Sequence, residues 1–129
     1  MKNIKKSVLY VDDCEEVCEL MRDMGRQEDL VVYTTSTIDK AKKAIEGFTF
    51  DAVITDMVMS NGPGGQGDEI VSLVKEKNPE IPVVVLTGMT GWSSYGINWS
   101  EAKDKSDLWL RKGVDGDEIS KAFNYVKGV

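Results

Sequence analysis

The chain has 129 residues, of which 41% are hydrophobic. This length and composition fit one globular domain over residues 1–129 and exclude a disordered chain. The net charge of −6 disfavours direct nucleic-acid binding, because such a protein needs a basic face to neutralise phosphates. No apolar run approaches the length needed to cross a bilayer, so we expect no membrane insertion.

The cysteines and the N-terminal segment indicate a cytoplasmic protein. Cys14 and Cys18 lie four residues apart, on one face of a predicted helix, and the chain has no His. This set is too small for a zinc site, so we expect free, reduced thiols. The basic start is followed only by the run Val8–Val11, which is too short for the apolar region of a signal peptide.

The first half of the chain alternates strand and helix patterns. Ser7–Val11 is a run of strand formers, and the helical spacing of apolar residues after it predicts a helix that ends at Gly25. Leu30–Tyr33 is a second predicted strand. The hydroxyl residues of Thr34–Thr37 are suited to cap a second helix, whose apolar side includes Phe48.

The second half continues this alternation as far as a last helix, which starts at Asp115 or Asp117. Ile81–Leu86 is the most hydrophobic run and is typical of a strand covered on both faces of a parallel sheet. The other predicted elements are strands at Phe50–Thr55 and Leu108–Leu110, a helix that ends at Lys77 and a short helix around Ser100–Lys105. Repeated strand–helix units favour an α/β fold with a parallel sheet and helices on both faces.

Polar side chains of chemical interest follow four of the predicted strands. Asp12 and Asp13 follow the first strand, Asp56 the third, Thr87 the fourth and Lys112 the fifth. In an open parallel α/β sheet, sites form just beyond the carboxyl ends of the strands. Each residue alone would more often be a turn or cap residue, but together they predict one site.

This set of groups suits a cation and a phosphoryl group. Three unpaired carboxylates in one place repel each other and raise at least one pKa, and a divalent cation removes that penalty. Mg²⁺ prefers oxygen ligands and keeps some waters, which leaves a position for a phosphoryl oxygen. A carboxylate can then attack phosphorus to form an acyl phosphate, while the metal, the amine and the hydroxyl hold the phosphoryl oxygens.

The order and spacing of these residues resemble the receiver domains of bacterial two-component response regulators, in particular stand-alone receivers of the chemotaxis-regulator type. The likeness extends from Lys5 to Val126. The motifs that carry it are Val8-Leu9-Tyr10-Val11-Asp12-Asp13, Phe50-Asp51-Ala52-Val53-Ile54-Thr55-Asp56-Met57-Val58-Met59, Val85-Leu86-Thr87-Gly88 and Leu108-Trp109-Leu110-Arg111-Lys112. The resemblance implies a flavodoxin-like (βα)₅ fold with strand order 2-1-3-4-5.

The resemblance implies a role for each residue of the site. Asp56 would accept a phosphoryl group from a histidine kinase or a phosphotransfer protein. Asp13 and Asp56 would ligate Mg²⁺ directly, together with the backbone carbonyl of Val58, and Asp12 would act through a metal-bound water. Lys112 would pair with Asp56 or, after transfer, with the phosphoryl group.

The resemblance also implies a switch. Thr87 would move toward a phosphoryl oxygen, and Trp109, at the position of the family's switch aromatic, would rotate in response. The face of the fourth helix and fifth strand would then bind a downstream protein that the sequence does not identify. The chain would be no enzyme, and its self-dephosphorylation would be slow because Val58 and Met89 are apolar.

Three segments depart from the family pattern. Gly113 replaces the usual proline after the lysine, so we expect a trans peptide bond there, or a local rearrangement that would alter the reach of Lys112. Ser60–Gly67 is a long glycine-rich loop that matches the dinucleotide fingerprint only weakly, since Asp56 beside it would repel a pyrophosphate. Gly88–Asp107 is long and glycine-rich where the family has a regular fourth helix.

Two other functions fit the same residues less well. A pseudo-receiver would bind partners without taking phosphate; the Gly113 change favours it and the intact acidic site opposes it. A Mg²⁺-dependent aspartyl-phosphate phosphatase of the haloacid dehalogenase type needs a second Asp two residues after the nucleophile, where this chain has Val58. A third alternative is that the chain is one domain of a larger regulator or hybrid kinase.

Overall fold

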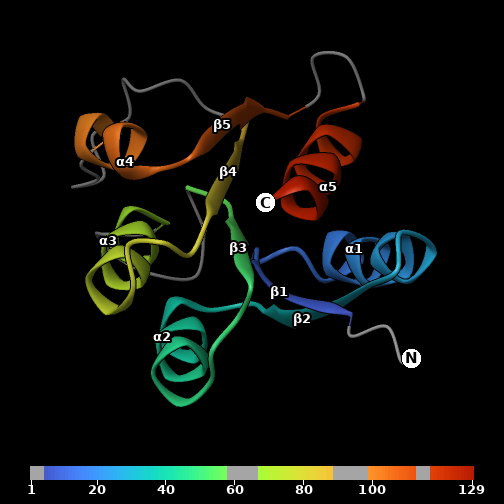
Figure 1. The fold of residues 1–129 in the computed structure, drawn as a ribbon, viewed down its shortest axis with the longest axis horizontal. Helices are drawn as coiled ribbons and strands as arrows, with labels where there is room; N and C mark the ends of the chain where they lie inside the picture. Colours follow the sequence, from blue (N-terminus) through green and yellow to red (C-terminus); the bar gives the residue numbers. More distant parts are fainter. Residues whose placement is uncertain (1–4, 58–66, 89–98, 113–116) are drawn as a thin grey trace.

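The computed structural model describes residues 5–57, 67–88, 99–112 and 117–129. These residues form a five-stranded parallel sheet in the order β2-β1-β3-β4-β5, with helices on both faces (Figure 1). The strands are β1 (Lys6–Val11), β2 (Leu30–Thr35), β3 (Ala52–Thr55), β4 (Val83–Thr87) and β5 (Leu108–Arg111). The helices are α1 (Glu15–Gln27), α2 (Ile38–Gly47), α3 (Gly67–Lys77), α4 (Trp99–Lys105) and α5 (Glu118–Gly128). The α/β fold and the strand order are confirmed, and the assignment of residues 1–129 to one domain stays a prediction.

The sheet separates two layers of hydrophobic core. Helices α2, α3 and α4 cover one face of the sheet, and α1 and α5 cover the other (Figure 1). Side chains of the first three helices pack with Leu9 and Val11, and those of the other two pack with Val8 and Tyr10. Successive residues of a strand point to opposite faces, so β1 contributes to both layers. β3 and β4 are buried along their whole length, which confirms the doubly covered strand predicted from the run Ile81–Leu86.

Helix α1 continues past the glycine at which the sequence predicted its end. Gly25 is buried within the helix, which extends to Gln27. A Cβ atom on Gly25 would lie 2.4 Å from Cγ2 of Val32, so α1 approaches β2 at a distance that only glycine permits. The predicted helix end was wrong because this glycine serves close packing. The chain instead leaves the helix through Asp29, whose φ of 62° lies in the left-handed region.

The ends of helix α2 show one correct and one wrong prediction. Thr37 is the N-cap, and its side-chain oxygen accepts a hydrogen bond from the backbone N–H of Lys40 at 3.1 Å, as the hydroxyl-rich segment predicted. Phe48 was expected on the buried side of the helix, but it is 68% exposed. The helix ends at Gly47 and the backbone of Phe48 is extended, which turns its ring away from the core.

The remaining elements lie close to their predicted positions. α4 starts one residue before the predicted helix, and α5 has Asp117, one of the two predicted starts, at its N-cap. β3 and β4 begin later than predicted, at Ala52 and Val83. Pro82 has no N–H to donate to a strand, although its carbonyl still accepts from the backbone of Val53 at 3.0 Å.

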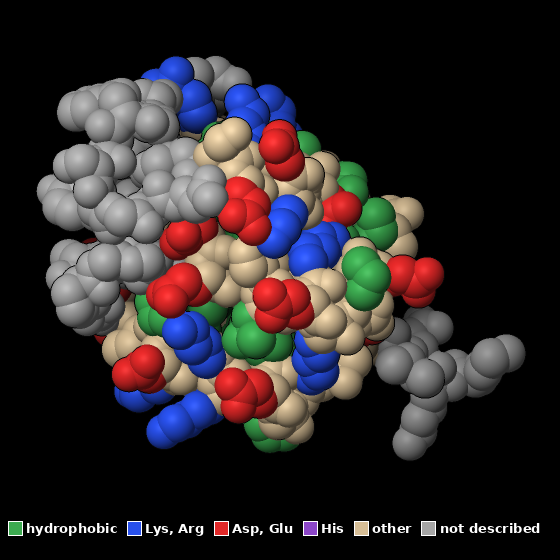
Figure 2. Space-filling view, turned by 90° about the vertical axis from the view of Figure 1, so that its left-hand side faces the viewer, with side chains coloured by type: hydrophobic (Ala, Val, Ile, Leu, Met, Phe, Trp, Pro, Cys, Tyr) green, Lys and Arg blue, Asp and Glu red, His purple; other side chains and the backbone are tan. Residues whose placement is uncertain are grey.

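One face of the molecule mixes charges of both signs. The face that lies on the left of Figure 1 shows Lys and Arg interspersed with Asp and Glu, with only small hydrophobic areas between them (Figure 2). Among the described residues, no helix has the length and apolar character that a membrane span requires.

We predict that Gly25→Ala lowers the free energy of unfolding by about 1–3 kcal/mol, because the added methyl overpacks the contact between α1 and β2. Urea denaturation measures the change. Gly47→Ala is the control, since a Cβ there meets no heavy atom within 4 Å, and it should leave stability unchanged or slightly higher. Equal stabilities of the two variants would contradict the packing role of Gly25.

Candidate functional site

The carboxyl ends of the strands bring the predicted site residues together. Asp12 and Asp13 follow β1, and Asp56 follows the neighbouring strand β3. The backbone N–H of Asp56 donates to the carbonyl of Val11 at 3.0 Å, which extends the pairing of the two strands up to the site. Lys112 follows β5 and reaches back to both Asp12 and Asp56. The acidic residues and the lysine predicted from the sequence therefore lie together.

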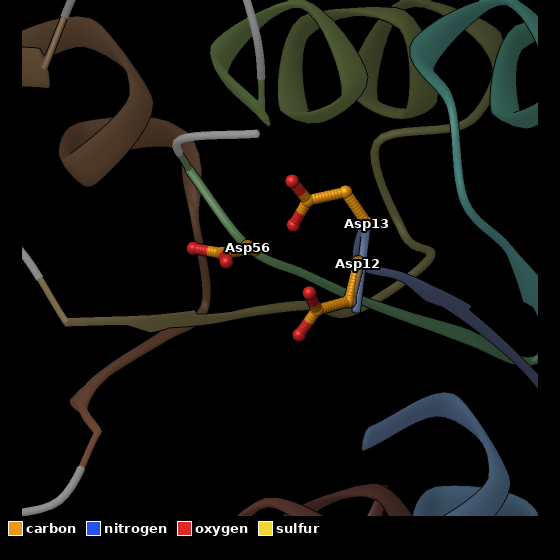
Figure 3. A group of neighbouring side chains, drawn as sticks. All are labelled: Asp12, Asp13 and Asp56. Atoms are coloured by element: carbon orange, nitrogen blue, oxygen red, sulfur yellow. The ribbon is translucent and has the colours of Figure 1, made fainter. Parts of the chain in front are cut away.

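Three carboxylates form one cluster at the carboxyl ends of β1 and β3 (Figure 3). Asp12, Asp13 and Asp56 each offer an oxygen, and these oxygens lie within 4.8 Å of one another. Asp12 is 1% exposed and Asp56 9% exposed, whereas Asp13 is half-buried. Negative charges this close and this poorly hydrated need positive charge beside them.

Lys112 supplies part of that positive charge. Its Nζ donates to Oδ2 of Asp12 and to Oδ2 of Asp56, at 3.0 Å in each case. Its backbone N–H donates to the carbonyl of Thr87 at 2.9 Å, which fixes the lysine beside the end of β4. One ammonium group therefore bridges two of the carboxylates but cannot neutralise the charge of all three.

The pKa values of the cluster reflect this incomplete compensation. Burial raises the pKa of Asp56; Lys112 lowers it without cancelling that effect, and the charge of Asp12 raises it further. Burial acts to lower the pKa of Lys112, but the charges of Asp56 and Asp12 together outweigh burial and raise it. The lysine thus stays protonated, while the Asp56 carboxylate is short of stabilising charge. Such an arrangement favours a further cation.

Tyr10 belongs to the site, although the motif that contains it implied no role for this residue. Its hydroxyl donates to Oδ2 of Asp12 at 2.6 Å, and the backbone N–H of Cys14 donates to Oδ1 of Asp12 at 3.0 Å. Burial and the charge of Asp12 raise the pKa of the Tyr10 phenol, so the hydroxyl keeps its proton. The signal was present in the sequence, since residues two apart on a strand point to the same face.

Gly67 packs against the backbone of Asp56. It is the first residue of α3, and its N–H donates to the carbonyl of Met57 at 3.0 Å. A Cβ atom on Gly67 would lie 2.0 Å from the carbonyl oxygen of Asp56, so only glycine fits. This close approach gives a packing reason for the last glycine of the weak dinucleotide fingerprint.

The two cysteines are free, as predicted. Cys14 is exposed at the start of α1, whereas Cys18 is buried and its thiol donates to the backbone carbonyl of Asp12 at 3.3 Å. Burial and the charge of Asp12 raise the pKa of Cys18 to about 11. Cys18 is therefore a neutral thiol at neutral pH, and its hydrogen bond helps to hold the backbone of Asp12 in place.

Thr87 and Trp109 lie on the strands beside the cluster. Thr87 is fully buried at the end of β4 and accepts the backbone hydrogen bond of Lys112. Trp109 pairs with Val85 across β4 and β5, and it is half-buried against the core layer of α2, α3 and α4. Their roles as switch residues stay predictions.

Some predicted features lie outside the described residues and stay predictions. They are the carbonyl of Val58, the apolar side chain of Met89, residues 58–66 of the glycine-rich loop, residues 89–98 before α4, and Gly113 with its peptide bond.

We predict that Tyr10→Phe lowers the free energy of unfolding by about 1.5–3 kcal/mol, because the buried Asp12 carboxylate loses a charge-assisted hydrogen bond. Urea denaturation measures the loss. Tyr33→Phe, at a tyrosine that is 53% exposed, is the control. It should change the free energy of unfolding by less than about 0.5 kcal/mol. If Tyr10→Phe were as stable as this control, Tyr10 would only fill space.

Comparison with known proteins places these features in a family. The model of the response regulator receiver domain matches residues 8–124. The response regulator protein PilR of Pseudomonas aeruginosa is 27% identical over 84 residues, and the photosynthetic apparatus regulatory protein RegA of Cereibacter sphaeroides is 22% identical over 118 residues. The matches cover 64% and 92% of this chain but only 18% and 61% of those proteins, so this chain corresponds to a part of each.

Solved structures show the same fold. The response regulator TrrA of Thermotoga maritima, in complex with Mg²⁺ and BeF, has a TM-score of 0.76 at 22% identity over 94% of this chain and 98% of that one. A CheY-like receiver domain protein of Methanospirillum hungatei has a TM-score of 0.77 at 17% identity over 97% of this chain and 98% of that one. Since the family model spans nearly all of the sheet and its helices, this chain belongs to the response regulator receiver domain family.

Proposed function

We propose that this receiver domain is a phosphorylation-dependent signalling switch in which Asp56 accepts a phosphoryl group from a histidine kinase or a phosphotransfer protein. One observation supports this most strongly: the Lys112 ammonium lies 3.0 Å from Oδ2 of Asp56, inside a cluster of three carboxylates. An ammonium at that place can pair with the carboxylate before the transfer and with a phosphoryl oxygen after it.

The chemistry proposed for Asp56 is a displacement at phosphorus. An oxygen of its carboxylate forms a bond to phosphorus while the P–N bond of the donor phosphohistidine breaks, and the electron pair of that bond returns to the imidazole nitrogen. The backbone N–H of Met57 donates to Oδ1 of Asp56 at 2.7 Å and Lys112 holds Oδ2. These two donors orient the carboxylate, and burial, which raises its pKa, makes it more basic.

The donor set of the cluster fits Mg²⁺. Its three carboxylate oxygens lie within 4.8 Å of one another and are the hard ligands that this cation prefers. As the family resemblance implies, we assign direct contacts with the cation to Asp13 and Asp56 and a contact through a metal-bound water to Asp12. We assign the remaining protein ligand to the carbonyl of Val58. When bound, the cation offsets the negative charge of the phosphoryl oxygens.

In the proposed switch, β4 and β5 transmit the conformational change away from the site. The backbone N–H of Lys112 donates to the carbonyl of Thr87. Trp109 lies on β5, the strand that leads directly into Lys112. A shift of Lys112 toward a phosphoryl group would therefore act on both residues, and through them on the face of α4 and β5. A downstream protein would recognise that face in the phosphorylated state.

We further propose that the chain is a phosphoacceptor and not an enzyme with turnover, apart from slow self-dephosphorylation, and that it acts in the cytoplasm. The pseudo-receiver stays the main alternative, and the ordered bonds among Lys112, Asp12 and Asp56 speak against it. The phosphatase alternative lacks its second Asp, because position 58 is Val.

Incubation with acetyl phosphate and Mg²⁺ should add one phosphoryl group, read as intact mass. Asp56→Asn should abolish the addition, because it removes the nucleophilic oxygen, and Asp39→Asn, at an exposed position on α2, should retain it. The absence of any addition to the unmodified protein would favour the pseudo-receiver. Addition to Asp56→Asn would move the acceptor to another residue.

Mg²⁺ should stabilise the folded protein, because the unfolded chain does not assemble the cluster. At a Mg²⁺ concentration about a hundredfold above the dissociation constant, the free energy of unfolding should rise by about 2.7 kcal/mol relative to EDTA. Asp13→Asn should lose most of this gain in urea denaturation, whereas Asp39→Asn should keep it. Full stabilisation of Asp13→Asn would show that Asp13 is no ligand.

A further inference from the structure

Strand β2 is an edge strand without the usual protection. It lies at the end of the sheet order and pairs with β1 through six residues in continuous register. Its sequence, Leu-Val-Val-Tyr-Thr-Thr, has no charge, proline or glycine. Natural edge strands are usually blunted by such residues, by bulges or by shortness. The opposite edge follows that rule, since β5 has four residues and ends at Arg111.

The backbone of β2 has hydrogen-bonding groups directed away from the sheet. The N–H of Asp12 donates to the carbonyl of Thr35 at 3.1 Å, so the main-chain groups of Thr35 face β1. In a parallel ladder these groups alternate along the strand, so those of Tyr33 also face β1. The main-chain N–H and carbonyl of Val32 and Thr34 then point outward, where the described residues include no further strand.

A pocket lies beside this edge, on the face of the sheet covered by α2. Its volume is about 350 Å³, and none of the side chains that line it is charged. Tyr33 and Phe48 form part of its wall and are 53% and 68% exposed. The ring of Phe50 lies beneath them, 5.9 Å from Tyr33 and 6.5 Å from Phe48 between centroids. Two of the four large hydrophobic side chains that are exposed in the described part of the chain therefore border this pocket.

We propose that the β2 edge and this pocket bind an extended, uncharged segment of a partner protein as an added strand, with one aromatic or large aliphatic side chain in the pocket. In this mode of recognition, main-chain hydrogen bonds provide affinity and a pocket for alternate side chains provides specificity. Here the outward main-chain groups of Val32 and Thr34 would form the hydrogen bonds. The pocket is lined by Tyr33, Phe48 and Phe50. A second copy of this chain is disfavoured as the occupant, because each copy carries a net charge of −6.

The probe is the peptide acetyl-Thr-Val-Thr-Phe-Thr-Val-amide, whose alternate residues place Val, Phe and Val on one face. Amide hydrogen exchange, followed by NMR on the full chain, is the measurement. Without peptide, the amides of Val32 and Thr34 should exchange faster than those of Tyr33 and Thr35. Saturating peptide should slow exchange at Val32 and Thr34 by roughly tenfold or more.

Two sets of variants separate the backbone and side-chain parts of the interaction. Two modified peptides carry N-methyl groups on the odd or on the even residues. Only one of the two sets of N–H groups faces β2, so one modified peptide should no longer protect Val32 and Thr34, whereas the other still should. Phe48→Ser should weaken binding by roughly tenfold, since an exposed ring that lines the pocket is removed. Leu20→Ser, at a leucine that is 47% exposed on α1 on the other face of the sheet, should leave binding unchanged.

The proposal is overturned by any of three results. The amides of Val32 and Thr34 could prove as protected as those of Tyr33 and Thr35 in the free protein. Peptide could bind equally well after either pattern of N-methylation. Protection at Val32 and Thr34 could rise with protein concentration and no peptide, which would assign the edge to a second copy.

Discussion

Repulsion among Asp12, Asp13 and Asp56 is the constraint on which the site depends. The parallel sheet brings these residues together because β1 and β3 are neighbours, and the burial of Asp12 and Asp56 prevents water from screening them. Lys112 offsets only part of the charge, although it bonds to two of the carboxylates. The folded chain therefore needs positive charge at the carboxyl ends of these strands, which the proposed Mg²⁺ would supply. A phosphoryl group on Asp56 would add negative charge and increase that need.

Residues to which the family motifs assign no role hold this cluster in place. Tyr10 and the backbone of Cys14 fix the two oxygens of Asp12, and Gly67 lets α3 begin against the carbonyl of Asp56. These contacts use a buried phenol, a backbone amide and the absence of a side chain, so none of them adds charge to the site. The acidic cluster is thus oriented by neutral groups, and its charge balance is left to Lys112 and to what binds there.

The α/β fold class and the acidic part of the site could be predicted from the sequence, because alternating strands and helices favour a parallel sheet whose sites form beyond the strand ends. The strand order was predicted from the family resemblance alone. Gly25 and Phe48 were mispredicted because local rules treat glycine as a helix end and Phe as a core residue, whereas the contact with Val32 and the end of α2 decide their places. Tyr10 and Gly67 were missed because their partners lie on Asp12 and Asp56, and a motif does not show such contacts.

The central claim is that one carboxylate of the cluster, that of Asp56, carries the phosphoryl group. Borohydride reduces an aspartyl phosphate to homoserine, so reduction of the phosphorylated protein followed by peptide mass spectrometry locates the acceptor directly. The proposed switch predicts homoserine at position 56 alone. Homoserine at position 12 or 13, or none after phosphorylation conditions that label another receiver domain, would contradict it.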